Sequence, residues 1–543
     1  MKSPPIEESW KCPRNGLRAG CERIHHTRTP RKFLVPSAPR SRYIEIPMTT
    51  SASPAIRTRE VRNFVGGAWH APTSETGLNL INPATGEPLG KSPSGSAAEV
   101  DAAVQAAQAA FPAWRSTPAP DRVQFLFKLK NLLEDHFDEL AAIITTENGK
   151  TLAEAKGELR RGIENVEVAC GIPVLMQGYS LEDVAPGIDE IMVRQPLGVC
   201  AIITPFNFPV MIPLWFLPYA IATGNAVVLK PSDRVPFSAA RLIELIHATG
   251  LPPGVVNLVN GGKPAVDALL DHPLVRAVSF VGSTPIAQYV YTRGSANGKR
   301  VQCQGGAKNH VVVLPDADPD TTTKIIADSA FGCAGQRCLA VSVTVTVGEA
   351  HNWFRDSIAA AASSLKVGNG LDPAVQMGPV ITATSRDRVV SLIGQGAADG
   401  AKPIVDGRGA SNASGSFVGP TVLDGLSANS PLMETEIFGP VLSVVHANSV
   451  DEAVAMIDRS PYGNASSIFT SSGAAARKFR NSVSTGNVGV NIGVPAPMAY
   501  FPFSGWKGSF FGVMHAQGRD AIEFYTDKKV IVERWPREWS RKF

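Results

Sequence analysis

The segment VSFVGSTPIAQYV (278–290) decides the fold class, because it joins a strand pattern to a helix pattern through a single turn. The apolar run ends at Gly282. Ser283 and Thr284 follow as candidate helix caps, and Pro285 stands at a first-turn position of the helix behind them. A strand that turns directly into a helix is the unit from which sheets with helical crossovers are built.

Alternating strand and helix patterns surround this segment. Helical patterns such as FSAARLIELIHATG (237–250) separate further apolar runs, and a second alternating block extends from about His310 to about Ile492. This rhythm predicts an α/β protein in which helices cover parallel sheets. The apolar runs that precede the opening segment are GVCAIIT (198–204), NAVVLK (225–230) and VVNLV (255–259).

A long helix is predicted near the start of the alternating region. Ser96 and Glu99 have the spacing of a capping box at the head of AAEVDAAVQAAQAAF (97–111). Its apolar residues recur on one helical face, and we expect Pro112 to end the helix.

The turn that follows the strand at 278–282 is also a candidate anion site. A helix N-terminus with free amides attracts phosphate. No GxGxxG follows a strand in this chain, so the usual dinucleotide fingerprint is missing. From the residues alone, an ordinary strand-to-helix connection explains the turn equally well.

Length and charge limit the functions that this chain can have. A chain of 543 residues is too long for one compact core and indicates two or three domains. The net charge of +4 comes from residues 1–47, which hold ten Lys or Arg against four Glu, and leaves 42 basic and 44 acidic residues in 48–543. We therefore expect no nucleic-acid partner. Residues 195–229 lack charge, but five prolines divide them into pieces too short to span a membrane.

The first sixty residues are predicted to be a disordered basic extension or a transit segment, and residues 1–47 contain no signal-peptide core. Seven scattered cysteines favour a reducing compartment, so we expect a cytoplasmic protein, or a mitochondrial one if the extension is a transit peptide. The spacing of the N-terminal Cys and His residues matches no zinc pattern, and we expect no metal. These residues are Cys12, Cys21, His25 and His26.

The octet FGCAGQRC (331–338) holds the best candidate for covalent chemistry. Only a thiolate attacks carbon, and the adjacent Arg337 is expected to lower the pKa of the Cys338 thiol. A buried structural cysteine is the alternative. Gln336 and Arg337 stand where a core segment would be apolar, so Cys338 is the predicted nucleophile and Cys333 is a packing or redox neighbour.

The octet resembles the active-site signature of the aldehyde dehydrogenase superfamily, and the resemblance extends from about Asn63 to the end of the chain. Four segments are similar to its methylmalonate-semialdehyde dehydrogenase branch, which acylates coenzyme A; they are RGIENVE (161–167), GAKNH (306–310), AGQRC (334–338) and FPFSGWKGSFFG (501–512). The motifs shared with the whole superfamily are NFVGGAW (63–69), ENGKT (147–151), TPFNFP (204–209), VLKPSD (228–233), FVGST (280–284) and EIFGPV (436–441).

The resemblance implies a division into domains. A Rossmann-type NAD-binding domain is expected from residues 61–180 and 198–304, and an α/β catalytic domain from residues 305–500. Residues 181–197 and 524–543 have strand patterns, and in the superfamily these segments pair as an oligomerisation β-ribbon. We therefore expect a homotetramer.

The resemblance also implies NAD as cofactor and assigns residues to it. Lys230 and Asp233 would contact the adenosine ribose, where a carboxylate accepts from hydroxyls and repels a 2′-phosphate, so NAD is favoured over NADP. Asp233 replaces the more usual Glu. The remaining expected cofactor-binding residues are Phe206, Gly282, Ser283, Glu436 and Phe438.

The catalytic step needs a stabilised oxyanion, because thiolate attack on an aldehyde makes a tetrahedral oxyanion before hydride leaves. By resemblance, Asn207 and the amide of Cys338 form the oxyanion hole. Hydrolytic relatives release the acyl thioester with a Glu-activated water, but Gln304 occupies that position here, and an amide is not a base. A thiol acceptor needs far less help to ionise, which favours coenzyme A as co-substrate.

The resulting hypothesis is oxidative decarboxylation of malonate or methylmalonate semialdehyde to acetyl-CoA or propionyl-CoA. Guanidinium groups match carboxylates well, so Arg161 and Arg337 are the predicted clamp for the substrate carboxylate. One alternative is a hydrolytic semialdehyde or aldehyde dehydrogenase in which another carboxylate, for example Glu436, serves as base. Another is a noncatalytic NAD-binding protein.

Overall fold

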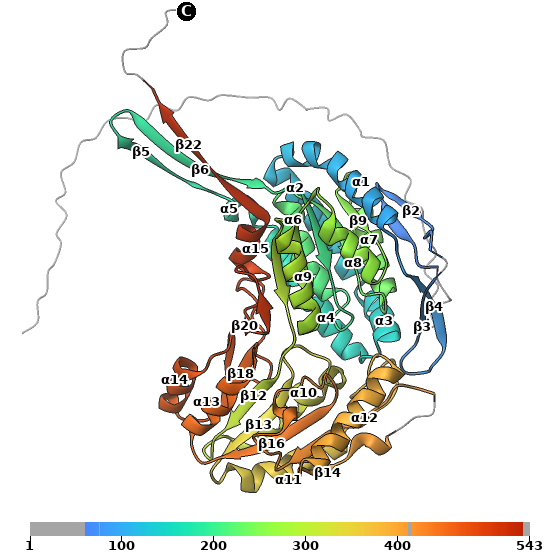
Figure 1. Cartoon of the computed structure of the whole chain (residues 1–543), viewed down its shortest axis with the longest axis vertical. Helices are drawn as coiled ribbons and strands as arrows, with labels where there is room; N and C mark the ends of the chain where they lie inside the picture. Colours follow the sequence, from blue (N-terminus) through green and yellow to red (C-terminus); the bar gives the residue numbers. More distant parts are fainter. Residues whose placement is uncertain (1–59, 75, 411–413, 536–543) are drawn as a thin grey trace, which may run out of the picture. The chain divides into compact units, whose positions relative to one another are not determined.

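The computed structural model describes residues 60–74, 76–410 and 414–535. The expectations for residues 1–59, and for the ribbon after residue 535, lie outside this part of the chain. Two large sheets and a small antiparallel ribbon organise the described residues (Figure 1).

The first sheet has eight strands in the order β2-β1-β9-β8-β7-β10-β11-β21. Its five central strands are parallel to one another, whereas β1, β2 and β21 pair antiparallel at the edges. The central strands are β9, β8, β7, β10 and β11. The strands are β1 (Asn63–Val65), β2 (Ala68–His70), β7 (Val199–Ile203), β8 (Ala226–Lys230), β9 (Val256–Leu258), β10 (Val275–Val281), β11 (Arg300–Gln304) and β21 (Phe510–Phe511).

Helices cover both faces of this sheet because its strand residues alternate between two cores. Along β7, Val199, Ala201 and Ile203 pack with α1, α8 and α9, while Cys200 and Ile202 face the helices on the other side. The helices on the first face are α1 (Ala97–Ser116), α8 (Lys263–Asp271) and α9 (Thr284–Ala296). The helices on the other face are α2 (Ala119–Asp135), α3 (Phe137–Asn148), α4 (Leu152–Ala169), α5 (Ile172–Leu175), α6 (Met211–Ala222), α7 (Pro236–Ala248) and α15 (Gly518–Tyr525).

The order of the strands places a crevice between β7 and β10. The chain proceeds outward from β7 through β8 to β9, then returns to β10 on the other side of β7 and continues to β11. Ligands of open α/β sheets bind at such a switch point, outside the carboxyl ends of the strands. Thr204 and Gly282 follow these two carboxyl ends.

The uncharged stretch 195–229 forms the end of β6, then β7, the wholly buried helix α6 and most of β8. No helix in the described residues is long and apolar enough to cross a membrane. The prediction that Pro112 ends helix α1 is wrong: the helix runs to Ser116 because Trp114 is buried in the core and donates its indole N–H to Ile221 O at 3.1 Å.

The second sheet has seven strands in the order β14-β15-β16-β13-β12-β18-β19, all parallel except β14. Its strands and helices share one apolar core. The elements are β12 (Asn309–Val313), α10 (Pro319–Phe331), β13 (Val341–Val347), α11 (Ala350–Ser364), α12 (Ala383–Ala398), β14 (Lys402–Val405), β15 (Thr421–Asp424), β16 (Val441–Ala447), α13 (Val450–Arg459), β18 (Ala465–Phe469), α14 (Gly473–Ser482) and β19 (Asn487–Val490).

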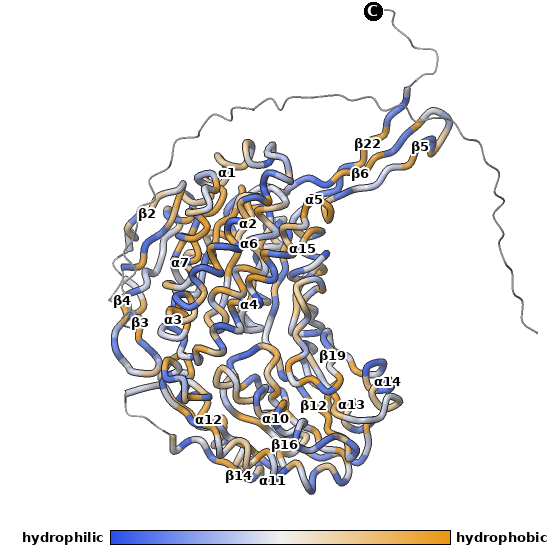
Figure 2. The backbone as a smooth tube through the Cα atoms, turned by 180° about the vertical axis from the view of Figure 1, so that it is seen from behind, coloured by the Kyte–Doolittle hydropathy of each residue, from blue (hydrophilic) through white to orange (hydrophobic). Residues whose placement is uncertain are grey.

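The ribbon consists of β5 (Tyr179–Ala185), β6 (Ile188–Pro196) and β22 (Thr526–Arg534), paired antiparallel with β6 in the middle. It projects away from the sheets (Figure 1), and its strands carry mixed hydrophobic and hydrophilic residues (Figure 2). Two further pairs are β3 (Gly77–Ile81) with β4 (Pro88–Pro93) and β17 (Tyr462–Gly463) with β20 (Trp506–Lys507).

Candidate active site

Cys338 lies in a tight loop between α10 and β13. The loop reverses through three consecutive residues in the left-handed region, Cys333, Ala334 and Gly335, with φ of 51°, 51° and 70°. A Cβ at Gly335 would lie 2.0 Å from Gly439 O, so only glycine fits there. Non-glycine residues held in this region cluster at active sites and ligand-binding loops.

A cleft of about 900 Å³ opens at the carboxyl ends of the first sheet and ends at Cys338. Residues next to both sheets line the cleft, because Glu436 and Phe438 lie just before β16 of the second sheet. Every residue that the sequence assigned to catalysis or to the cofactor lines this cleft: Phe206, Asn207, Lys230, Asp233, Gly282, Ser283, Cys338, Glu436 and Phe438.

The far end of the cleft fits a dinucleotide. Ser283 is the N-cap of α9, and no side-chain cap bond from it to the helix is present in the described structure, so first-turn amides remain available for a phosphate. A Cβ at Gly282 would lie 2.5 Å from the Phe280 ring. Lys230 is buried and donates from Nζ to Gly261 O at 2.7 Å, and burial lowers its pKa to about 8.

The near end of the cleft holds the half-buried carboxyl group of Glu436. Glu436 Oε1 accepts from the Ala307 amide at 2.9 Å, and burial raises the pKa of Glu436 to about 7. Burial also lowers the pKa of the neighbouring Lys308 to about 7, while the charge of Glu436 raises it. Phe206 and Phe438 meet edge to face with ring centroids 5.9 Å apart. Together these groups form a polar and aromatic border beside Cys338.

A buried ion pair holds Asn207 in position. Lys150 Nζ donates to Glu158 Oε2 and to the backbone oxygen of Asn207, both at 2.6 Å. Glu158 Oε1 accepts from the amides of Val210 and Met211. The Asn207 side chain donates one N–H to Gln336 O at 3.1 Å, and its second N–H remains for an oxyanion.

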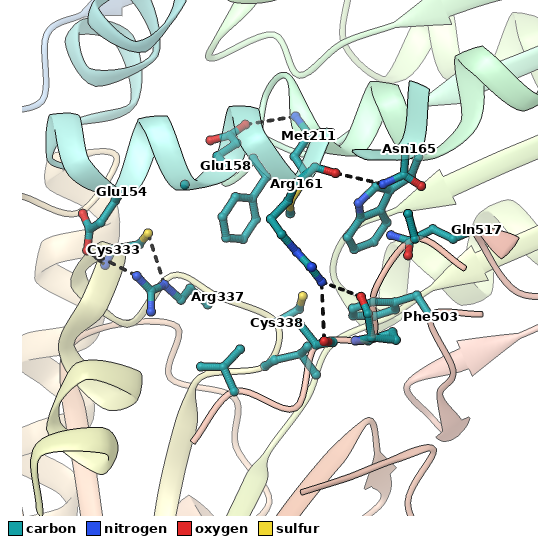
Figure 3. Close-up of a pocket in the computed structure, with 18 of the residues that line it drawn as sticks. Glu154, Glu158, Arg161, Asn165, Met211, Cys333, Arg337, Cys338, Phe503 and Gln517 are labelled. Atoms are coloured by element: carbon teal, nitrogen blue, oxygen red, sulfur yellow. Dashed lines mark hydrogen bonds and ion pairs between the residues drawn. The ribbon is translucent and has the colours of Figure 1, made fainter. Parts of the chain in front are cut away.

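A second pocket of about 480 Å³ reaches Cys338 from the other side and contains Arg161 and Arg337 (Figure 3). Arg161 reaches in from α4 and donates to Glu164 Oε2 at 2.9 Å and to Pro497 O at 2.5 Å. Apolar side chains form most of its remaining wall, among them Phe208, Met211, Trp215, Val494 and Phe503. Such a pocket suits a short apolar molecule with one negative end.

Arg337 lies against Cys333 rather than against Cys338. Its Nε is 3.3 Å from the Cys333 sulfur, and its NH2 group is 3.4 Å from Glu154 Oε1 (Figure 3). Burial and then the charge of Glu436 raise the pKa of the Cys338 thiol to about 12, and the opposing effect of Arg337 is smaller. Arg337 therefore lowers the pKa of the Cys338 thiol only slightly, less than the sequence led us to expect. The positive charge of a bound oxidised nicotinamide would lower this pKa further.

Gln304 ends β11 and is outside the residues that line either pocket. It is buried, and its amide oxygen and nitrogen have no hydrogen-bond partner within the described residues. The carboxylates of the substrate pocket are already engaged, because Glu158 pairs with Lys150 and Glu154 accepts from the Cys333 amide. Glu436 is thus the carboxyl group best placed to influence Cys338.

Several residues of the site carried no signal in the sequence beyond their motifs. Lys150 stands in ENGKT, but its partner Glu158 is eight residues away on a helix, a spacing without a pattern of its own. The side chains that sequence reasoning missed are Lys150, Glu154, Glu158, Phe208, Met211, Trp215, Arg388, Val494, Phe503 and Gln517.

Comparison with known proteins confirms the family resemblance. The aldehyde dehydrogenase family model matches residues 69–531. Malonate-semialdehyde dehydrogenase 2 of Geobacillus kaustophilus (strain HTA426) is 49% identical over 477 residues, which cover 88% of this chain and 99% of that protein.

Two solved structures share the fold. The crystal structure of methylmalonate-semialdehyde dehydrogenase from Oceanimonas doudoroffii matches with a TM-score of 0.86 and 47% identity. A protein of Sinorhizobium meliloti 1021 crystallised with NAD matches with a TM-score of 0.87 and 46% identity. Each alignment covers 88% of this chain and 98% of the other. The chain therefore belongs to the aldehyde dehydrogenase family and has the aldehyde dehydrogenase fold.

Proposed function

We propose that this protein oxidises malonate or methylmalonate semialdehyde with NAD and transfers the acyl group to coenzyme A, with loss of CO2. The observation that carries the proposal is the position of Cys338, the one described residue that lines both the cofactor cleft and the pocket of Arg161. The names of the relatives at 46 to 50% identity point to the same substrates.

The residues divide the reaction between them. The thiolate of Cys338 attacks the aldehyde carbon, and the Asn207 amide with the Cys338 N–H stabilises the oxyanion. NAD held in the cleft by Lys230, Asp233 and Glu436 would supply the hydride acceptor, and an acyl thioester would then remain on Cys338. Arg161 and Arg337 hold the substrate carboxylate during attack. That carboxylate is β to the thioester carbonyl, so loss of CO2 sends its bonding electrons toward the carbonyl oxygen at Asn207, and protonation of the carbon completes the step.

Coenzyme A is the acceptor that this site favours. Gln304 cannot take a proton from water, whereas the thiol of coenzyme A ionises near pH 8.5 and attacks the thioester without a strong base. The second candidate is hydrolysis with Glu436 as base, and the pKa of Glu436 near 7 is the observation that favours it.

An aldehyde-by-acceptor activity matrix separates these functions. With malonate semialdehyde and NAD, we expect one rapid NADH burst without coenzyme A and continuous turnover to acetyl-CoA with it. Equal steady-state rates with and without coenzyme A would assign the protein to the hydrolytic function. Absence of a burst with every aldehyde would leave a noncatalytic NAD-binding protein.

We further propose that the ribbon β5–β6–β22 assembles the protein into a homotetramer. Large apolar side chains stand exposed on it, including Leu181, Val530 and Val532, each more than 60% exposed. Such side chains on strand edges are normally covered by a partner. Val530→Lys with Val532→Lys should lower the mass measured by light scattering after size-exclusion chromatography, and an unchanged mass would argue against the ribbon.

A further inference from the structure

Three potential metal ligands meet at the end of the second sheet that is remote from Cys338. Asp424 is the last residue of β15, His446 is the sixth of seven residues in β16, and His351 lies in the first turn of α11, which follows β13. One ligand atom from each side chain lies within 4.8 Å of the others. The Cys338 loop precedes the opposite end of β13, a strand about 23 Å long at 3.3 Å per residue.

Hydrogen bonding fixes the orientation of His446. The Thr346 hydroxyl oxygen lies 2.6 Å from His446 Nδ1 and 3.3 Å from Val445 O, and its bond to Nδ1 holds the ring in place. His446 Nε2 points toward Asp424 and lies 3.6 Å from its Oδ1. In the tautomer that carries its hydrogen on Nδ1, Nε2 has a free lone pair, and a cation between it and Asp424 Oδ1 would be bound by both atoms.

The other two side chains are also prepared for a cation. Asp424 is 8% exposed, and its Oδ2 accepts from Arg355 Nε at 3.0 Å, which keeps the carboxylate oriented. Its Oδ1 and His351 Nδ1 are buried without a hydrogen-bond partner in the described part of the chain. The His351 and His446 rings are in contact, with centroids 3.7 Å apart. A buried polar atom without a hydrogen-bond partner destabilises the fold, so a cation bound to these two atoms would stabilise it.

We propose that His351, Asp424 and His446 form a binding site for Zn²⁺ or a similar divalent transition metal. Two imidazoles and one carboxylate are a common zinc ligand set with one open position. Zinc bonds of about 2.0 to 2.2 Å place tetrahedral ligand atoms about 3.4 Å apart, so the atoms here need to approach by about 1.4 Å at most. The His446–Thr346 bond is the outer hydrogen bond that ligating histidines usually make. The ion would tie α11 to the ends of β15 and β16.

Zinc binding to the full chain tests this site. After treatment with a chelator, equilibrium dialysis against Zn²⁺ should give one more bound ion per chain in the unaltered protein than in His351→Gln, Asp424→Asn or His446→Gln. The matched control is His272→Gln, because His272 pairs with Asp101 at 2.9 Å without a second histidine. It should bind as much Zn²⁺ as the unaltered protein.

Spectroscopy distinguishes this site from the cysteines. Co²⁺ bound here should give visible absorption bands without a sulfur-to-metal band, and these bands should disappear in the three variants. Thr346→Val keeps all three ligands and should weaken Co²⁺ binding about tenfold or more. A normal NADH burst verifies that each variant is folded. Equal Zn²⁺ uptake in all folded variants, or Co²⁺ spectra with only sulfur bands, would overturn the proposal.

Discussion

The two pockets that meet at Cys338 differ in how the chain builds them. The cofactor cleft is formed largely by turns that directly follow parallel strands, so its residues come in short motifs such as VLKPSD and FVGST. The substrate pocket is assembled from α4, α6 and the loops near residues 494–503 and 517, which are distant in sequence. Motifs therefore reveal where a cofactor binds more readily than they reveal which substrate is chosen.

Cys338→Ala should have the largest effect, because among the described residues Cys338 alone lines both pockets. We expect no NADH burst and no turnover, while NAD binding measured by fluorescence titration persists. Cys333→Ala is the matched control and should retain most activity, since Cys333 lies outside the cofactor cleft and its thiol is not the proposed nucleophile. A normal burst from Cys338→Ala in stopped-flow measurements would remove the nucleophile from this site.

The sequence predicted the parts of the site that depend on backbone topology. The parallel strands β7, β8 and β10 end side by side, which is why residues next to those ends converge. Arg337 shows where adjacency along the chain misleads. The left-handed turn at 333–335 folds its guanidinium back over Gly332, where a Cβ would lie 2.5 Å from it, and beside Cys333.

Partners that are distant in sequence could not be predicted. Glu158 and Lys150 form their pair only because α4 packs against α6 and the loop before it. In the same way, the burial of Trp114 extends α1 past Pro112, although a proline inside a helix normally kinks or ends it.

Lys150→Met should damage both pockets at once, because the pair anchors Asn207 on one side and Met211 on the other. It leaves the Glu158 carboxylate buried and unpaired, at a cost of about 3 to 5 kcal/mol in the free energy of unfolding measured with urea. The double variant with Glu158→Gln keeps acceptors for the amides and removes the charge, so it should recover part of the loss. A double variant as unstable as the single one would show that the charge is not the cause.

Arg161→Leu should affect only the substrate pocket. Loss of its charged hydrogen bonds to the substrate carboxylate, about 1.5 to 3 kcal/mol, should lower kcat/KM for malonate semialdehyde roughly ten- to a hundredfold. Propanal, which has no carboxylate, should be affected much less. Arg160→Leu is the matched control on the same helix, because Arg160 pairs with Glu134 outside the pocket. Equal losses for both aldehydes would exclude a carboxylate clamp.

The smallest effect should be the pH dependence of NAD binding, which tests only the cofactor cleft. An ionised carboxylate at position 436 accepts from ribose hydroxyls, so affinity should rise as pH increases through the Glu436 pKa of about 7. A protonated Lys230 donates to ribose, so affinity should fall as pH increases through its pKa of about 8. At pH 6 only about a tenth of Glu436 is ionised, which limits the loss to about tenfold.

Two variants identify the group that causes the rise of NAD affinity at acidic pH, here called the acidic limb, and the group that causes its fall at alkaline pH, the alkaline limb. Glu436→Gln should remove the acidic limb, even though Lys308 titrates in the same range, and Lys230→Met should remove the alkaline limb. Dissociation constants from NADH fluorescence between pH 5.5 and 9 provide the measurement. If the acidic limb persists in Glu436→Gln, then Lys308 controls it, and the carboxylate at 436 has another role beside Cys338.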